Sequence, residues 1–350
     1  FRKIWGRHDF SSKRQENLPQ GLESYGAYVQ DRLQLFRQIS ASSLSFLFTC
    51  PYRFLLHKLQ LREDLSEEKQ KTLWEGRWLH QIFEAFYTGQ IEGKRIITPL
   101  PRKLTLKTNE IIEFAVERLS VITKKSIPSD LQGSPLQLHL AKYAWPRFAK
   151  HWASFFRQVN TQESIFETQT VLCEHAVDTQ SHSLKLWEES VQITGSLDNF
   201  VSFNGHFILT DYKRKGVDSV AQVQKGLAPQ LPLYALAMQE NPQTCELMTK
   251  GVSGYWSIIE GKWYPRAKSS GPSDLSSETK LCSSQTPIIE QQIRTLQALW
   301  QEVVQSFVVE KKPFQPQVSE ACDFCSFHGI CRKNDPTIQA SRQQLETSNG

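Results

Sequence analysis

Asp198, Asp211 and Lys213 are the residues whose types and positions most directly suggest chemistry. Two carboxylates held side by side repel each other, and a divalent cation bound between them removes that repulsion. Carboxylate oxygens are hard ligands that suit Mg²⁺ or Mn²⁺. An ammonium group beside such a cation can orient an attacking water or stabilise charge on phosphoryl oxygens. If these side chains meet, they form a set suited to metal-dependent hydrolysis of phosphodiester bonds.

The segment that carries these residues has the pattern of a β-hairpin. Two alternating stretches, rich in β-branched and aromatic residues, flank Asn204-Gly205. Asn-Gly is the strongest short-range hairpin signal, because a type I′ turn needs positive φ at both central residues. With a two-residue loop, Asp198 lies directly opposite Asp211, and Lys213 shares the face of Asp211. The alternative is a surface hairpin with solvated charges, which the cross-strand alignment disfavours.

Two predicted helices carry further polar residues. Gln230 and Tyr234 are four residues apart in a helix predicted over 229–239, so they share one face. His80 lies in a helix predicted over 74–87, where apolar residues recur at helical spacing. Without other signals, a helical tyrosine or histidine is more often a packing residue than a ligand.

Three cysteines near the C-terminus have the spacing of a metal site. Cys322, Cys325 and Cys331 form C-x₂-C-x₅-C, and the chain has seven cysteines in all. An odd number without a secretion signal argues against a disulfide framework and favours metal binding. The fourth ligand is either His328, which gives a Cys₃His zinc site, or Cys50, which gives four thiolates for a [4Fe–4S] cluster.

The remaining pattern predicts an α/β protein. Helices are predicted over 44–59, broken at Pro51, over 108–158 and over 288–309. Strands begin near residue 163 and are predicted over 165–171, 191–203 and 206–213. Residues 37–335 are expected to form one domain. We divide the chain into a polar N-terminal segment, a helical insertion, a catalytic core, a cysteine-containing segment and a mobile tail, at residues 1–36, 61–160, 163–260, 311–335 and 336–350.

The overall composition is that of a globular protein with a small excess of positive charge. The formal net charge is +5 over 350 residues, which is weak support for a polyanionic partner. No apolar run approaches the roughly 20 residues of a membrane helix. No signal-peptide pattern opens the sequence, so we expect a cytoplasmic protein without membrane association. The sequence has no P-loop motif, so an ATP-driven motor would belong to another chain.

The hairpin residues resemble the core motif of the PD-(D/E)XK nucleases, in the RecB-like branch. The resemblance rests on Gly195-Ser-Leu-Asp198 followed by Ile208-Leu-Thr-Asp211-Tyr-Lys213. It implies a restriction-endonuclease-like mixed β-sheet flanked by helices. It also implies that Asp198, Asp211 and Lys213 are catalytic, with Mg²⁺ or Mn²⁺ as the cofactor.

The same resemblance assigns roles to the helical residues. Gln230-Leu-Pro-Leu-Tyr234 matches a Gln-x-x-x-Tyr helix that borders the active site in RecB-like nucleases, which makes Gln230 and Tyr234 members of the catalytic set. His80, at the end of a Gly-x-x-x-His element, matches a histidine that reaches the metal site. The implied metal ligands are therefore His80, Asp198 and Asp211.

Two further features follow from the comparison with this family. Many relatives carry an acidic residue on the strand before the hairpin, and we expect Glu167 in that role, with Glu174 as the alternative. The residue after the catalytic lysine is usually small in relatives, whereas this chain has Arg214-Lys215-Gly216. This departure leaves the catalytic residues intact and adds side chains for phosphate contacts.

The cysteines extend the resemblance to iron–sulfur members of this branch, which include bacterial recombination nuclease subunits and CRISPR-associated exonucleases. These proteins carry one cysteine before the nuclease core and three after it. The element Cys50-Pro51-Tyr52-Arg53-Phe54 looks like their first-cysteine element. The resemblance thus covers roughly residues 40–332. It implies that a [4Fe–4S] cluster, bound by Cys50, Cys322, Cys325 and Cys331, acts as a structural staple.

The resemblance implies a nuclease that hydrolyses DNA. We expect an exonuclease that acts on single-stranded or free DNA ends, in repair, recombination or CRISPR-type processing, with a helicase or CRISPR-type protein as partner. One alternative is a catalytically idle nucleic-acid-binding subunit of a helicase–nuclease assembly. Another is a zinc-stabilised structural adaptor, which His328 would support.

Overall fold

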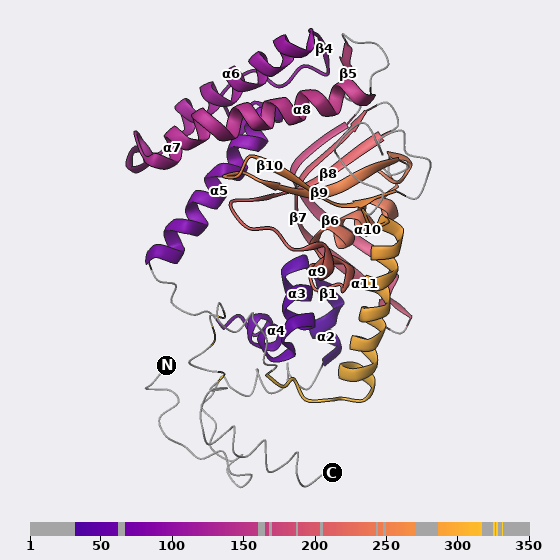
Figure 1. Ribbon diagram of the computed structural model, residues 1–350. Coiled ribbons are helices and arrows are strands. Elements are labelled where there is room, and N and C mark those ends of the chain that lie inside the picture. The colour runs from indigo at the N-terminus through magenta and orange to yellow at the C-terminus, as the bar shows by residue number, and fades with distance from the viewer. Residues whose placement is uncertain are drawn as a thin grey trace.

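The fold is a mixed β-sheet with helices on both faces. The computed structural model describes residues 32–61, 67–159, 165–167, 170–186, 188–203, 206–242, 244–247, 250–269, 286–316, 325, 327 and 331. Within these residues the sheet separates two hydrophobic cores, and helices cover each core from outside (Figure 1). The observed architecture is the mixed α/β arrangement that the sequence predicts.

The central sheet has six strands in the described part of the chain. Its order is β1-β7-β8-β9-β10, and β6 also pairs with β7. The β1–β7 and β8–β9 pairs are parallel, and the others are antiparallel. The strands are β1 (Gln38–Ile39), β6 (Thr170–Leu186), β7 (Glu189–Phe203), β8 (His206–Lys213), β9 (Lys250–Ser257) and β10 (Lys262–Lys268). Two small antiparallel sheets pair β2 (Gln90–Ile91) with β3 (Lys94–Arg95), and β4 (Lys103–Thr105) with β5 (Ile165–Glu167).

Strand β7 is paired differently along its two edges. One edge pairs with β6 along nearly all of the strand. The other edge pairs with β1 at residues 192–193 and with β8 at residues 199–203. Residues 194–198 therefore lie between the ends of β1 and β8, and we call this opening the fork. A fork is a place where side chains and backbone groups are free to build a site, because the regular ladder is interrupted there.

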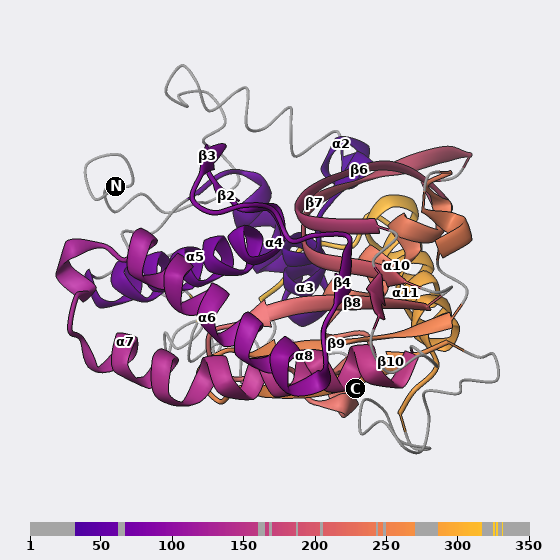
Figure 2. The same ribbon diagram turned by 90° about the horizontal axis from the view of Figure 1, so that it is seen from above.

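The helices divide between the two faces. One core contains residues of α2 (Arg32–Arg37), α3 (Ala41–Thr49), α4 (Pro51–Lys58), α9 (Val220–Gln224), α10 (Gln230–Glu240) and α11 (Ile289–Val303). The other contains residues of α5 (Glu67–Thr88), α6 (Thr108–Ser126) and α8 (Trp145–Val159), which run alongside one another (Figure 2). The shorter helices are η1 (Ser129–Leu131), α7 (Pro135–His139), η2 (Leu140–Ala144), η3 (Cys245–Leu247) and η4 (Val304–Val309).

Local sequence explains why the first helices begin and end where they do. Ser40 caps α3, since its hydroxyl accepts the Ser43 N–H while Ser43 bonds back to the Ser40 N–H. Cys50 is extended and Pro51 opens α4, where its missing N–H removes no helical bond. The predicted break at Pro51 is therefore confirmed.

The N-terminal helices pack against the C-terminal part of the chain through aromatic rings. Phe36 stacks on Phe54 with ring centroids 5.3 Å apart, and Phe307 stacks on Phe314 at 4.9 Å. The Phe36 and Phe314 rings join the two pairs at 6.2 Å. The Arg32 guanidinium donates to the Phe307 carbonyl at 3.3 Å. We call this contact the terminal junction.

Helix α6 fixes the C-terminal end of α5. The buried Arg118 side chain donates to the carbonyl of Phe86 at 2.6 Å and to that of Thr98 at 2.6 Å. Phe86 lies in the last turn of α5, where helical carbonyls lack intrahelical partners. The buried arginine satisfies one of these groups and so ties α5 to the helices that cover it.

The sequence prediction was wrong about one long strand. It placed strand structure near 165–171 and resumed it at 191, whereas β6 continues from Thr170 to Leu186. Much of β6 is partly or fully exposed, and its pairing shifts between Ser181 and Lys185. The alternation that marks a half-buried strand is therefore weak along β6. The helices predicted within 108–158 correspond to α6, α7, η2 and α8.

Candidate active site

Three acidic residues form a row across neighbouring strands at the fork. The hairpin register is the predicted one, because Phe203 pairs with His206 and the ladder continues to Asn199 and Thr210. Asp198 and Asp211 are the next residues along the two strands. On the other side of β7, the pairs 173–199 and 175–197 place Glu174 opposite Asp198. The row thus runs from β6 through β7 to β8.

The first half of the row forms a group with a helical histidine. Ligand atoms of His80, Glu174 and Asp198 all lie within 4.8 Å of one another. His80 Nδ1 is 3.0 Å from Glu174 Oε1 and 3.7 Å from Asp198 Oδ1. The Tyr212 backbone N–H donates to Asp198 Oδ2 at 2.7 Å, which fixes that carboxylate.

The second half of the row is a network around Asp211. The Lys213 ammonium lies 2.8 Å from Asp211 Oδ2 and donates to the Gln230 side-chain carbonyl at 2.9 Å. The Gln230 amide in turn donates to Asp211 Oδ1. Tyr255 is fully buried beside this network, paired with Asp211 on the neighbouring strand, and its ring centroid is 5.4 Å from Lys213 Nζ. Asp211, Lys213 and Gln230 are therefore each held by the other two.

Burial and mutual repulsion set the protonation of these groups. Burial raises the pKa of Asp198 well above its usual value, and the Asp211 carboxylate raises it further. Burial alone would lower the pKa of His80, but the bond to Glu174 and the nearby carboxylates outweigh it and raise the pKa to about 9. Burial would also lower the pKa of Lys213, and Asp211 outweighs it and raises that pKa. The site therefore favours a proton on Asp198 and positive charge on His80 and Lys213.

The hydrogen bonds of His80 agree with a protonated ring. Its Nδ1 faces the Glu174 carboxylate and its Nε2 lies 3.0 Å from the Tyr212 carbonyl oxygen. Both partners are acceptors, so both ring nitrogens must donate. His80, Glu174 and Asp198 would hold a divalent cation once the His80 Nδ1 proton has been released. The donor set of one imidazole and adjacent carboxylates suits Mg²⁺ or Mn²⁺.

The structure brings together the sequence-predicted site residues from four elements. Asp198, Asp211 and Lys213 come from the hairpin, Gln230 from α10 and His80 from α5. The Asp211 carboxylate is occupied by Lys213 and Gln230. The three residues whose ligand atoms lie within 4.8 Å of one another are His80, Glu174 and Asp198, and Asp211 is not among them. His80 lies in the middle of α5, a helix that starts before the predicted one.

Tyr234 borders the fork from α10. It packs against Gly195, where a Cβ atom would lie 2.8 Å from the Tyr234 hydroxyl oxygen. Burial raises the pKa of Tyr234, and the charges of Asp198 and Asp211 raise it further. Glycine at 195 therefore leaves room for a neutral phenol beside the acidic row.

The preference for Glu167 as the additional acidic residue was wrong. Glu167 lies in β5, which pairs with Lys103 in a separate two-stranded sheet. Glu174 stands at the fork instead, with a φ of 44°, in the left-handed region that non-glycine residues seldom adopt. This backbone conformation has no sequence signature, and β6 itself was not predicted at this position. Sequence reasoning also missed Tyr255, which carries no motif.

Two cysteines of the predicted cluster, Cys50 and Cys331, affect Tyr52 in the first turn of α4. Burial raises the pKa of the Tyr52 phenol, and the charges of Cys331 and Cys50 raise it further. Both sulfurs are thus near Tyr52. Cys325 is also described and half-buried, whereas Cys322 and His328 lie outside the described residues.

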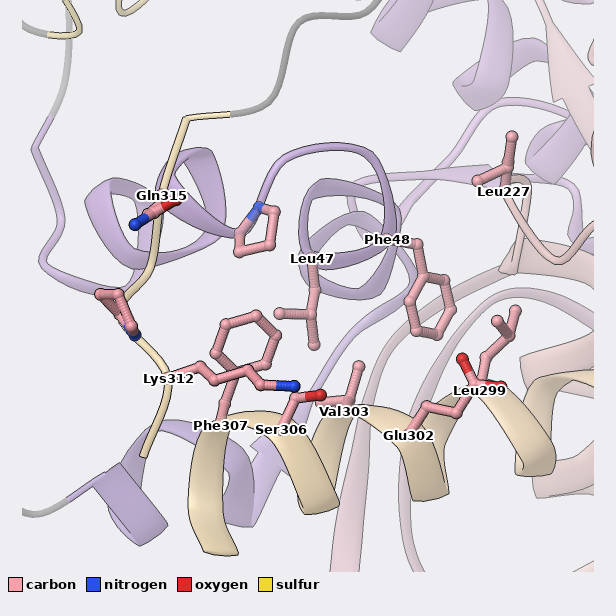
Figure 3. A pocket seen from close by; sticks show the side chains of 12 residues that line it. Leu47, Phe48, Leu227, Leu299, Glu302, Val303, Ser306, Phe307, Lys312 and Gln315 are labelled. Atoms are coloured by element: carbon pink, nitrogen blue, oxygen red, sulfur yellow. The ribbon is translucent and has the colours of Figure 1, made fainter. Parts of the chain in front are cut away.

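A groove lies beside the terminal junction. It has a volume of about 540 Å³, and its walls come from α3, the start of α4, α11, η4 and the segment around Lys312 (Figure 3). Its lining is largely apolar, with Leu47, Phe48, Leu299 and Phe307 directed into it. The predicted site residues at the fork are not among those that line it.

Comparison with known proteins identifies the family. In the part of the chain that the structure describes, no helix is both long and apolar enough to cross a membrane. No curated protein matches the chain in sequence. The family model for the PD-(D/E)XK nuclease superfamily matches residues 38–332, which include every residue of the acidic row. The chain therefore belongs to the PD-(D/E)XK nuclease superfamily.

Proposed function

We propose that this protein is a Mg²⁺- or Mn²⁺-dependent nuclease that hydrolyses DNA phosphodiester bonds. The observation that carries the proposal is the row of Glu174, Asp198 and Asp211 across adjacent strands, with Lys213 beside it. Such a row is unfavourable for folding unless a cation or protons neutralise it. The family membership supports the same reaction class.

The residues at the fork have separate roles in the reaction. His80, Glu174, Asp198 and Asp211 would hold the cation, which supplies Lewis-acid stabilisation of phosphoryl charge when bound. Lys213 places its ammonium beside Asp211, where it can orient an attacking water and stabilise negative charge on the phosphate.

Gln230 and Tyr234 act from helix α10. Gln230 accepts a hydrogen bond from Lys213 and donates one to Asp211, so it fixes both groups in one geometry. We assign Gln230 as a positioning residue for this pair. Tyr234, a neutral phenol beside Gly195, borders the space that a scissile phosphate would occupy. These roles follow from the contacts and from the resemblance in the sequence.

We further propose that the enzyme attacks single-stranded or free DNA ends, in repair, recombination or CRISPR-type processing. A helicase or CRISPR-type protein is the partner that this reaction needs to supply opened DNA. The resemblance to RecB-like nucleases supports both points. We place the catalytic core at residues 163–260, extended by His80 of the helical insertion.

We also propose that Cys50, Cys322, Cys325 and Cys331 bind a [4Fe–4S] cluster. The charges of Cys50 and Cys331 both act on Tyr52, which supports their proximity. The aromatic contacts of the terminal junction already hold the two ends of the domain together. A cluster at this place would link metal binding to folding.

Metal analysis tests the cluster. Protein purified without oxygen should be brown and contain about four irons per chain. Cys50→Ser should then destabilise the domain as much as Cys325→Ser. Colourless protein with about one zinc per chain, and a severe effect of His328→Ala, would replace the iron–sulfur proposal by a zinc site.

A cleavage assay tests the nuclease. End-labelled single- and double-stranded DNA is incubated with the full chain and Mg²⁺ or Mn²⁺, with a chelator in the control. We expect metal-dependent cleavage that starts from an end. Intact DNA with wild-type protein that still binds DNA would support the idle-subunit alternative and contradict the proposal.

A further inference from the structure

The N-terminal half of α5 exposes two large apolar side chains beside the candidate active site. Leu73 is 59% exposed and Trp74 is 36% exposed. The end of α5 that carries them extends beyond the sheet (Figure 1). Tryptophan is usually well buried, so an exposed tryptophan directly beside an exposed leucine is a candidate binding surface.

An ion pair fixes this part of α5 next to the catalytic hairpin. The Glu75 carboxylate, only 9% exposed, lies 2.7 Å from Nη2 of Arg214. Arg214 directly follows Lys213, and Glu75 directly follows Trp74. The ion pair therefore ties the helix turn that carries Leu73 and Trp74 to the residue that follows Lys213.

The same helix surface leads from these residues to His80. Arg77 is exposed and is three residues from both Trp74 and His80, and four from Leu73. Residues at these spacings are neighbours on a helix surface. The helical rise places Trp74 roughly 9 Å along the axis from His80. Gly76 lies on this surface, with open space where a Cβ would stand.

Positive charge accompanies the apolar residues. Lys71, Arg77 and Lys215 are exposed. A strip that combines an aromatic ring with cationic side chains fits a strand whose bases stack and whose phosphates pair with lysine or arginine.

We propose that Leu73, Trp74 and Arg77 bind the single-stranded part of the nucleic-acid substrate next to the scissile phosphate. Trp74 stacks on a base, Leu73 extends the apolar contact, and Arg77 pairs with the phosphate between that base and the metal site. The proposal rests on the function proposed above and specifies its substrate as single-stranded. In a duplex the base faces are already stacked on each other, so Trp74 cannot reach them.

Two substitutions at Trp74 separate stacking from simple apolar contact. Trp74→Phe keeps an aromatic ring, whereas Trp74→Leu keeps apolar bulk without one. Binding is measured by fluorescence anisotropy of labelled single strands and of blunt duplexes of equal length, with Ca²⁺ in place of Mg²⁺ or Mn²⁺. From stacking energies of about 1–3 kcal/mol per base, we expect Trp74→Leu to weaken single-strand binding about tenfold. We expect Trp74→Phe to stay within about threefold of wild type and duplex binding to change little in both variants.

Arg77→Gln tests the phosphate contact by a different readout. Loss of one phosphate contact should reduce the slope of log affinity against log salt by about 0.7 for single strands. Trp74→Leu should leave that slope unchanged. Val309→Ala, at an apolar residue that is 47% exposed on η4, is the matched surface control and should alter neither quantity.

Cleavage provides the second measurement. The ratio of kcat/KM for a single strand to that for bis-p-nitrophenyl phosphate, which cannot reach Trp74, should fall about tenfold in Trp74→Leu. Equal single-strand binding by wild type and Trp74→Leu, or equal losses for single strands and duplexes, would overturn the inference. If wild type binds single strands through Trp74 but cleaves neither substrate, the proposed nuclease function fails while the binding surface stands.

Discussion

The fork and the terminal junction are both built from residues far apart in the sequence, but they are held together by opposite kinds of interaction. At the fork, buried Asp198 and Asp211 repel each other and are kept in place by protons, Lys213 and hydrogen bonds. At the terminal junction, Phe36, Phe54 and Phe314 pack ring against ring. The fork contributes unfavourable electrostatic energy to the folded state, and binding of a cation can relieve it. The terminal junction stabilises the folded state, because its aromatic rings are buried. Substitutions in the two regions should therefore separate activity from stability.

The largest effect is expected at Lys213. Lys213→Ala removes the ammonium next to Asp211 and should reduce cleavage by about 10²–10³-fold, the range for loss of one charge-stabilising donor. The free energy of unfolding should also fall, because the buried Asp211 carboxylate loses its cationic partner, but this loss is smaller than the effect on cleavage. Cleavage rates and urea titrations measure both quantities. Lys262→Ala, at an exposed lysine on β10, is the matched control, and undiminished cleavage by Lys213→Ala would contradict the assigned site.

The terminal junction should respond in the opposite way. Phe314→Ala leaves a cavity among three rings and should lower the free energy of unfolding by about 3 kcal/mol. The cleavage rate per folded molecule should stay near that of wild type. Urea titration of Phe314→Ala beside the exposed-site variant Val309→Ala measures the effect. A loss of stability below about 1 kcal/mol would show that the junction is not a tightly packed core.

Asp198→Asn sharpens the contrast, because it should stabilise the metal-free protein. The pKa of Asp198 is higher in the folded than in the unfolded protein, so the folded state holds the proton more tightly. The resulting stability is present at low pH and is lost as the pH rises through the folded-state pKa. At neutral pH the neutral amide should raise the Tm of metal-free protein by about 3 °C and abolish the further rise on adding Mn²⁺. Thermal scans with and without Mn²⁺ test this, and a lower Tm for metal-free Asp198→Asn would refute it.

The smallest effect is expected at Gly195. A methyl group there would displace the Tyr234 hydroxyl and would be strained at the φ of 157°, so Gly195→Ala should slow cleavage by about tenfold and also lower the stability. In a Tyr234→Phe background the clash is relieved, and the same substitution should have a smaller relative effect. A double-mutant cycle on cleavage rates measures this coupling. Equal effects in both backgrounds would exclude the contact as the cause.

Sequence reasoning could predict the hairpin and its register because both depend on local signals. Asn204-Gly205 and the alternation around it are sufficient to pair Phe203 with His206, and the resemblance of Gln230-Leu-Pro-Leu-Tyr234 to a family helix places Gln230 near the hairpin. The helix that contains His80 was also visible as a periodic pattern.

The fork could not be predicted, because its boundaries are set by contacts distant in sequence. Strand β1 has only two residues, Gln38 and Ile39, and its pairing with residues 192–193 follows from packing of α2 and α3. Glu174 depends on the course of β6 and on one left-handed residue. A sequence pattern records neither. The sequence pattern identified the two acidic residues on the hairpin, but it could not identify Glu174 as the third acidic residue beside them.

The row of acids also restricts how the length of the chain can vary between related proteins. Side chains alternate on a strand, so a residue inserted between Asp198 and Phe203, or between His206 and Asp211, would turn one aspartate away from the other. A residue added to the two-residue connection after Phe203 lengthens only the loop and leaves both ladders in place. Insertions in natural homologues, and successful fusions of a second domain, should therefore fall at 204–205 and avoid the five residues on either side.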